Sequence, residues 1–473
     1  MALLIARSRP RPEPPPAPAS TLPAISGEEW RGIYGEGRKI GYAHRVRSPT
    51  ADGFAIAAES AIELRLMGAA QSVRTRWNAD TDRALRLRGF DFRLRSGTID
   101  VSMSGAVRGD RLEVNSDALG ALSIELPPSG SITLSETLQD VLAHETLEPG
   151  RTLRYALFDP LSAAPASVSL TVGPLERVVL PSGVRFAHRV DEEFQGSRFR
   201  LWVEPGVGVI REEGPLGLTI VRETDGRAAL AGLEPGAGID LASAAAIPVA
   251  RVIGAPRSTR RLRLRISDAP ADHPLSFPPR QRRSGTELLL EREDPATFRS
   301  FPLPNREARF ADDLRATPFL QTGDARVGGA AREALGGEGD AARAAQKLLL
   351  WVYRSLAKVP TVSVPNALQV LEQRRGDCNE HAVLYAALAR AAGLPARIAS
   401  GAVYMPGEGG AAGAFYYHAW NEVWLGEWVA VDPTFGQFPA DATHVKLAEG
   451  GPDKDVALLG MIGRLRLEVE DAS

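Results

Sequence analysis

The sequence predicts an α+β protein in which a mostly antiparallel β domain precedes a mixed core of helices and strands. Apolar and polar residues alternate with a period of two from about residue 28 to residue 224, a pattern typical of half-buried strands. Helical periodicity instead governs the segments after Asp340 and Cys378. Because 473 residues are too many for one hydrophobic core, two to three domains are expected.

The strand pattern opens with a hairpin, since residues 30–34 and 40–44 flank the turn Gly35-Glu36-Gly37-Arg38. A helix is expected near residues 138–145. Further strands are expected at 54–66, 85–95, 98–107, 168–172 and 199–203. These features indicate a generic antiparallel sheet over residues 25–225. The pattern also resembles the open half-barrels of bacterial envelope proteins that hold lipid or peptide. No catalytic constellation is present here, so a binding or positioning role is expected.

The rest of the chain divides by composition. Residues 226–248 are rich in Ala and Gly without periodicity, which indicates a linker. Residues 249–305, with alternating strands at 261–267 and 286–293, are expected to lead into a catalytic domain over 306–473. Within that domain Asp340 is expected to cap a helix, and a second short helix is expected over 367–374. The buried face of the first is predicted to be Ala341, Ala344, Ala345, Leu348, Val352 and Leu356.

Residues 1–24 form a Pro-rich tail behind a short apolar start, Met1–Ala6. That start is shorter than the ~7–15 residue core of a secretory signal and has no basic residues before it. The tail is therefore interpreted as a disordered cytoplasmic segment or as the remnant of a membrane anchor. Pro-rich spacers often join an anchor to a folded domain, so we favour the cell envelope or periplasm over the cytoplasm.

Charge and hydropathy exclude two classes of partner. A net charge of −2 with scattered Lys and Arg gives no electrostatic basis for nucleic-acid binding. No apolar run approaches the ~20 residues that span a bilayer, so membrane association is expected only through a missing N-terminal anchor. The oligomeric state stays open.

Cys378 is the only cysteine and is either core filler or a reagent. After it, Leu384, Ala387, Leu388 and Ala391 are spaced as one helix face, and Gly393 and Pro395 give a stop signal. Cys378 is thus expected in the first turn, where free backbone N–H groups favour an anion. We expect a lowered thiol pKa there, and a backbone N–H that serves as half of an oxyanion hole.

An imidazole and a carboxylate follow in a predicted hairpin. Residues 415–425 read as a strand that carries His418, and Gly426-Glu427 turns the chain into a second strand that ends at Asp432. A carboxylate one strand away can hold the far N–H of the His418 ring and fix its tautomer.

Strand parity sets a condition on this pair. A two-residue hairpin pairing Leu425 with Trp428 would turn Asp432 away from His418. A three-residue loop pairing Trp424 with Trp428 would place both side chains on one face. Gly426 suits the positive φ that such a loop needs.

The segments around these residues resemble the transglutaminase-like superfamily. The resemblance covers about residues 310–450, and its motifs are Gly376-Asp377-Cys378-Asn379-Glu380-His381-Ala382, Arg390-Ala391-Ala392-Gly393-Leu394-Pro395-Ala396-Arg397, His418-Ala419-Trp420-Asn421-Glu422-Val423 and Trp428-Val429-Ala430-Val431-Asp432-Pro433-Thr434. It implies a papain-like core with Cys378 as nucleophile, His418 as general base and acid, and Asp432 as its orienter. No cofactor or metal ligand set is implied, and no acidic cluster resembles the calcium sites of animal transglutaminases.

Cysteine-dependent acyl transfer on protein or peptide amides is the expected function. Hydrolysis and transamidation share all these residues, so the choice between them stays open. The alternative is a non-enzymatic peptide-binding adaptor that keeps the fold.

Neighbouring residues have simpler expected roles. His381 is a less favoured base than His418, and His444 is expected to order a loop near the site. Glu380 and Glu422 are expected to be structural or solvated. The aromatic residues Tyr417, Trp420, Trp424 and Trp428 are interpreted as core rather than as a substrate groove.

Overall fold

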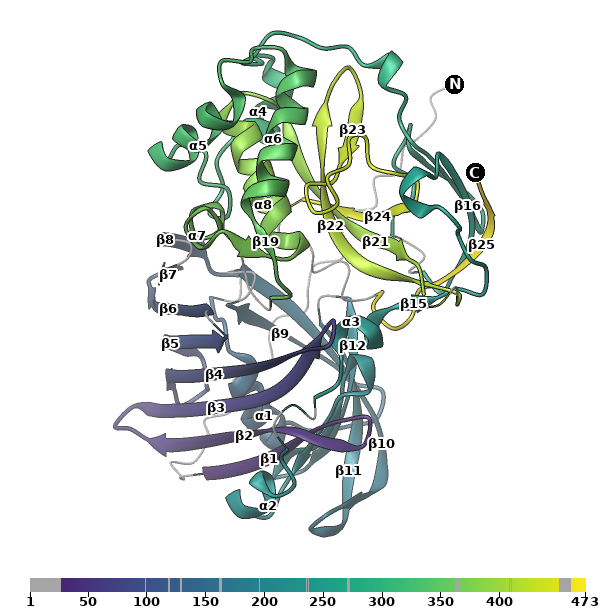
Figure 1. Cartoon of the computed structure of the whole chain (residues 1–473). Coiled ribbons are helices and arrows are strands. Elements are labelled where there is room, and N and C mark those ends of the chain that lie inside the picture. The colour runs from purple at the N-terminus through teal and green to yellow at the C-terminus, as the bar shows by residue number, and fades with distance from the viewer. Residues whose placement is uncertain are drawn as a thin grey trace, which may run out of the picture.

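The computed structural model describes residues 27–473 except 98, 118–119, 128–129, 161–163, 195, 235, 237, 270–272, 362–365, 408, 410 and 451–460. The tail of residues 1–24 therefore lies outside the described residues. Figure 1 shows a large curved sheet from the N-terminal half below a mixed core of helices and strands from the C-terminal half.

One antiparallel sheet of 14 strands forms the N-terminal part, in the order β8-β7-β6-β5-β4-β3-β2-β1-β14-β13-β12-β11-β10-β9. The order begins on β8 and ends on β9, and these two strands do not pair with each other. The sheet is therefore open and not a closed barrel. Its strands are β1 Gly27–Gly35, β2 Arg38–Pro49, β3 Gly53–Leu66, β4 Ala69–Asp82, β5 Leu87–Ser96, β6 Ile99–Arg108, β7 Arg111–Ser116, β8 Gly120–Glu125, β9 Thr152–Asp159, β10 Ala164–Leu180, β11 Gly183–Phe194, β12 Ser197–Glu204, β13 Gly208–Glu213 and β14 Thr219–Arg222.

The expected strands and the first hairpin are confirmed, but one strand is much longer than predicted. The sequence indicated a strand over 168–172, whereas β10 runs to Leu180. Gly173-Pro174 looks like a terminator because proline cannot donate to a strand ladder. The pairing instead shifts register between Val172 and Leu175, and a bulge of this kind lets a strand continue past the break.

Helix α1 (Ser135–His144) lies within the curve of this sheet (Figure 1). Its apolar residues Leu138 and Leu142 pack into a cluster with side chains of β9 to β13. On its other side Asp140 forms ion pairs with Arg45 and Arg47 of β2. The helix therefore joins strands that are far apart in the order of the sheet.

The segment after the sheet is not featureless. Residues 226–248 contain the short helices α2 (Gly226–Leu230) and α3 (Leu241–Ala245), and end in β15 (Ile247–Pro248). Asp225 and Asp240 cap the two helices. Strand β15 pairs with a strand of the C-terminal core, so the expected linker becomes part of both halves.

A second sheet has the order β17-β18-β16-β25, with strands β16 Arg261–Ser267, β17 Gln281–Ser284, β18 Glu287–Glu291 and β25 Arg466–Ala472. The two strands expected before the core are β16 and β18. The C-terminal strand β25 pairs with β16 across about 200 residues of sequence, a contact that no local pattern predicts.

The core combines a third sheet with five helices. Strands β15, β22, β21 and β24 lie in that order, and β23 pairs with β22. The strands are β21 Ala396–Met405, β22 Ala414–Trp424, β23 Trp428–Val431 and β24 His444–Glu449, and the helices are α4 Ala311–Leu314, α5 Ala325–Leu335, α6 Ala341–Ser355, α7 Ala367–Gln373 and α8 Cys378–Ala391. The short elements are η1 Pro215–Gly217, η2 Pro256–Ser258, η3 Pro295–Thr297, η4 Ala308–Phe310, β19 Ala357–Lys358 and β20 Arg375–Gly376.

Helix α8 is the central element of this core. It contacts α5, α6 and α7 on one side and β21 and β22 on the other. Its residues from Glu380 to Ala389 are all buried, as expected for a helix enclosed on every face. The expected helix that begins at Asp340 is also confirmed as α6, with the Asp340 carboxylate accepting the Arg343 N–H. None of the helices in the described ranges is long and apolar enough to cross a membrane.

Candidate active site

A capping box fixes the start of α8. The Asp377 Oδ1 accepts the Asn379 N–H at 3.0 Å, and the Glu380 Oε2 accepts the Asp377 N–H at 2.8 Å. The two carboxylates thus satisfy backbone donors that a helix start leaves free. Glu380 is structural, as expected, and Cys378 is the first residue of the helix.

The β22–β23 hairpin has the odd loop that strand parity requires. Trp424 pairs with Trp428, so residues 425–427 form the loop, and Gly426 has a φ of 89°. The pairing continues to Asn421 opposite Val431, which places Asp432 one step beyond, on the face that carries His418. The expectation of a three-residue loop is therefore confirmed.

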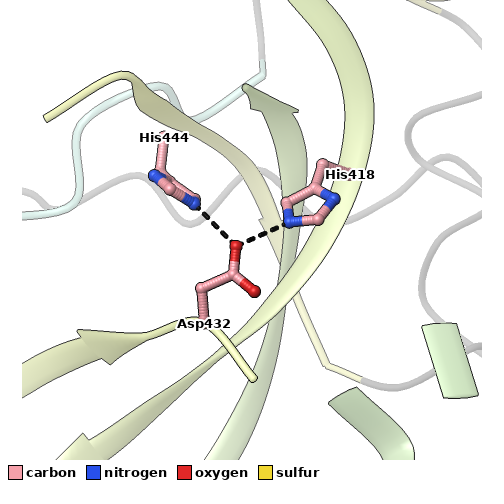
Figure 2. A group of neighbouring side chains, drawn as sticks. All are labelled: His418, Asp432 and His444. Carbon is pink, nitrogen blue, oxygen red and sulfur yellow. Dashed lines mark hydrogen bonds and ion pairs between the residues drawn. The ribbon is translucent and has the colours of Figure 1, made fainter. Parts of the chain in front are cut away.

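His418 and Asp432 meet across this hairpin. The His418 Nε2 lies 2.8 Å from the Asp432 Oδ2, as Figure 2 shows. The Phe435 ring stacks on the imidazole at 4.9 Å between centroids, with the planes 10° apart. One ring nitrogen is thus committed to the carboxylate and the ring plane is held, which leaves Nδ1 to face any reacting group.

Asp432 is fully buried and held from several sides. Its Oδ1 accepts the N–H groups of Thr434 at 2.7 Å and Phe435 at 3.0 Å. Burial by itself would raise the pKa of the Asp432 carboxyl, but His418 and His444 outweigh that effect and hold the pKa well below its usual range. Asp432 is therefore a carboxylate at neutral pH.

The Cys378 sulfur lies beside the backbone of β22, where the Ala419 N–H donates a hydrogen bond to it. Ala419 directly follows His418, so the thiol and the imidazole share one corner between α8 and β22. The expected lowering of the thiol pKa is wrong. Burial, followed by the charge of Asp377, raises the pKa of Cys378 well above the ordinary thiol range, and the Ala419 hydrogen bond does not outweigh them.

His444 was expected to order a loop near the site, and it reaches the site itself, through a contact with Asp432 that the sequence did not predict. Its Nε2 lies 3.0 Å from the same Asp432 Oδ2 that His418 contacts (Figure 2). His444 begins β24, which pairs with β21. The one sequence signal was a polar cluster, Asp441-Ala442-Thr443-His444, that leads into this strand.

His381 takes a different position. Its Nδ1 bonds to the Asp377 carbonyl oxygen at 2.6 Å, within the first turn of α8. Burial lowers the pKa of the His381 ring, so it is neutral at pH 7. Its Nε2 is buried without a hydrogen-bond partner among the described residues.

The aromatic residues of the hairpin are packing residues, as interpreted. Trp420 is fully buried in a cluster with Ala399, Ala430 and Ala440. Trp424 and Trp428 both pack against the ring of Phe310, at the loop end of the hairpin.

Glu422 is a buried structural carboxylate. It pairs with Arg397 and Lys446, each at 2.6 Å. These contacts fit the expected structural role.

The donor atoms of His418, Asp432 and His444 lie within 4.8 Å of one another, a spacing that a divalent metal could span. Hydrogen bonds of 2.8 and 3.0 Å already connect the three side chains, however. In this hydrogen-bonded arrangement each Nε2 donates a proton to Asp432, and a metal ligand would have to lose that proton.

The N-terminal sheet encloses a separate cavity of about 360 Å³ between α1 and the strands. Apolar side chains such as Trp77 and Leu201 line it together with carboxyl groups. Burial, with the neighbouring Glu212, raises the pKa of Glu192 in this lining to about 8. The volume is within the range of small-ligand sites.

Comparison with protein families gives one match, in which residues 329–433 fit the model of the transglutaminase-like superfamily. Comparison with curated proteins gives no match.

Among solved structures, a provisionally assigned cysteine protease from Cytophaga hutchinsonii is 16% identical, with 46% of this chain and 85% of that chain covered and a TM-score of 0.30. The periplasmic domain of TgpA from Pseudomonas aeruginosa is 17% identical, with 40% and 87% covered and a TM-score of 0.26. A beta-barrel-like protein from Brucella abortus is 8% identical, with 43% and 96% covered and a TM-score of 0.32. Likenesses this low carry no assignment of activity.

Proposed function

Residues 329–433 form a domain of the transglutaminase-like superfamily, and from this premise we propose that the protein is a cysteine-dependent acyl-transfer enzyme acting on protein or peptide amides. The observation that carries the proposal is the 2.8 Å bond between His418 and Asp432 beside the start of α8. In this proposal Cys378 is the nucleophile, His418 the general base and acid, and Asp432 the orienting carboxylate.

The first half of the reaction forms a thioester. The Cys378 thiol passes its proton to Nδ1 of His418 as its sulfur attacks the substrate carbonyl carbon. The new oxyanion accepts the Cys378 backbone N–H, which lies in the first helical turn and has no intrahelical acceptor. The C–N bond then breaks, and His418 returns the proton to the departing amine or ammonia.

The second half resolves the thioester. Water or an amine gives a proton to His418 and attacks the carbonyl, and the sulfur leaves as a thiolate that takes the proton back. Asp432 stabilises the imidazolium that forms in both halves and keeps the ring from rotating. Water gives hydrolysis and a lysine amine gives transamidation, and the same residues serve either outcome.

The raised pKa of Cys378 fits general-base activation at the moment of attack, because the free enzyme then carries a thiol beside the imidazole. The same observation is the best support for the rival function, a peptide-binding adaptor whose half-buried thiol never reacts. The N-terminal sheet, with its cavity, would present substrate in either case. We also propose that the protein acts in the cell envelope.

Trapping an acyl-enzyme separates the two functions. The full chain is mixed with an activated peptide ester and quenched in acid, and intact-mass and peptide-mapping spectra are recorded. The enzyme proposal expects the acyl mass on Cys378, and expects that mass to disappear with hydroxylamine. Cys378→Ala is the blank, and Asp432→Asn should slow acylation by roughly 10⁴-fold if its role matches that of the triad aspartate in serine proteases. A wild-type chain that binds the peptide but takes up no acyl group supports the adaptor.

A further inference from the structure

Two imidazole rings point at one carboxylate oxygen. Figure 2 shows His418 and His444 on either side of Asp432, each directed at its Oδ2, at 2.8 and 3.0 Å. A Cys–His–Asp mechanism needs only the first of these contacts. The second histidine has no part in the proposed reaction, yet it is fully buried in direct contact with the orienting residue.

Both nitrogens of the His444 ring face acceptors. The Nε2 faces the Asp432 carboxylate, and the Nδ1 lies 3.1 Å from the Asp441 carbonyl oxygen and 3.4 Å from the Asp441 Oδ1. A carbonyl oxygen cannot donate, and Asp432 is ionised, so each ring nitrogen must carry its own proton. A histidine with both nitrogens protonated is an imidazolium.

The charged groups around His444 support the same state. Asp432 and Asp441 face the ring, and Arg257 of η2 pairs with Asp441 at 3.0 Å. The His418 ring, on β22, has its centroid 5.8 Å from that of His444. Arg280, next to β17, binds the Asp441 carbonyl oxygen but pairs with Glu293, and Lys446 of β24 is held by Glu422 and Glu449. Trp420 and Phe435 complete the enclosure.

With His444 protonated, these charges balance. Two carboxylates, Asp432 and Asp441, stand against the guanidinium of Arg257 and the ring of His444. Burial alone would lower the pKa of His444, but the hydrogen bonds to Asp432 and Asp441 outweigh it and raise the pKa above its usual value. The cation is therefore stable where a lone buried imidazolium would not be.

We propose that His444 is a positioning residue of the active site, a buried imidazolium that fixes the Asp432 carboxylate for His418 and neutralises part of its charge. This inference rests on the proposed function, since it assigns Asp432 to His418. The second contact on the same oxygen holds the Asp432 carboxylate in the position from which it orients the His418 ring.

The matched variants are His444→Gln and His444→Phe in the full chain. Glutamine can place an amide donor near the position of Nε2 but carries no charge, whereas phenylalanine removes both donor and charge. His188→Gln is the control, because His188 lies in β11 of the N-terminal sheet, where its ring bonds to the Gly173 carbonyl oxygen. The readouts are the pH profile of kcat/KM on a small activated ester and the pH profile of Cys378 alkylation by iodoacetamide, which needs no turnover.

With His444→Gln the acidic limb of both profiles should move to higher pH by about one unit, because a nearby positive charge is gone. The plateau should stay within a few-fold of wild type. His444→Phe should lower kcat by roughly tenfold or more, as loss of a supporting partner does in other sites, with little change in KM. His188→Gln should leave both profiles in place.

A direct measurement settles the charge of His444. Nitrogen-15 spectra of the wild-type imidazoles at pH 7 should contain one ring with both nitrogens protonated that is absent from His444→Gln. The proposal is overturned if the acidic limb of the His444→Gln profiles coincides with that of wild type. It is also overturned if the His444 ring has one nitrogen without a proton. If the wild type turns over no ester, the enzyme function fails, while the alkylation profile and the spectra still decide the role of His444.

Discussion

Trp424 lies directly opposite Trp428 across the β22–β23 hairpin, and this register is what brings Asp432 to the same face as His418. Side chains alternate between faces at every residue, so a register with Leu425 opposite Trp428 would turn Asp432 to the other face. The geometry of the candidate site therefore depends on a loop of three residues that carries no catalytic group itself.

The Cys378 thiol should ionise only at high pH. Burial and Asp377 raise its pKa, so the midpoint of alkylation in the folded protein should lie above the ~8.5 of a free thiol. The same measurement in denaturant should return to about 8.5, and no other cysteine contributes to the signal. A native midpoint below the denatured one would show that the helix terminus and the imidazole prevail over burial.

This raised pKa also makes a stability prediction. The folded state holds the thiol proton above the pH at which the unfolded chain loses it, so the stabilisation is complete below about pH 8.5 and is lost as pH rises through the folded pKa. The melting temperature of the wild type should therefore fall faster than that of Cys378→Ala between pH 8 and 10. Parallel curves would mean that the thiol pKa is the same in both states.

Asp441 should make the fold sensitive to acid. Burial would raise the pKa of this carboxyl, but His444, Thr443 and Arg257 hold it below its usual range. Its contribution to stability is thus present above the unfolded pKa of ~3.9 and is lost as pH falls through the folded value. Asp441→Asn should lower the melting temperature at pH 7 and approach wild type below about pH 4. Asp312→Asn, at an exposed pair with Arg315, should show no such difference.

The cavity in the N-terminal sheet should matter for large substrates only. Thr75 of β4 lines it, and Thr75→Trp would fill much of the space. If this sheet presents substrate, the variant should turn over a small ester at the wild-type rate and a protein substrate more slowly. Val184→Trp on the exposed β10–β11 hairpin is the control. Equal rates on both substrates would remove the presenting role of the cavity.

Sequence reasoning located what depends on local signals. Helix α8 could be placed because its apolar spacing and its stop signal are both within about 20 residues of Cys378. The hairpin loop could be deduced because parity connects Trp424, Trp428 and Asp432 with no knowledge of the rest of the fold.

What depended on distant contacts was missed. His444 reaches Asp432 only because β24 pairs with β21, in a register with a shift between Ser400 and Gly401. The thiol pKa was predicted in the wrong direction because its sign depends on how deeply the fold encloses Cys378, which no short segment encodes. Both differences concern long-range packing around the candidate site.

The pairing of β15 with β22 affects how this protein can be divided. Ile247 lies opposite Phe415, on the strand that carries His418 three residues further on. A fragment that begins after residue 248 would lack β15, the outermost strand of the core sheet. The backbone of β22 would then be open to edge-to-edge association. A fragment meant to report on catalysis alone should therefore begin before α3, or its aggregation will be mistaken for a requirement for the N-terminal sheet.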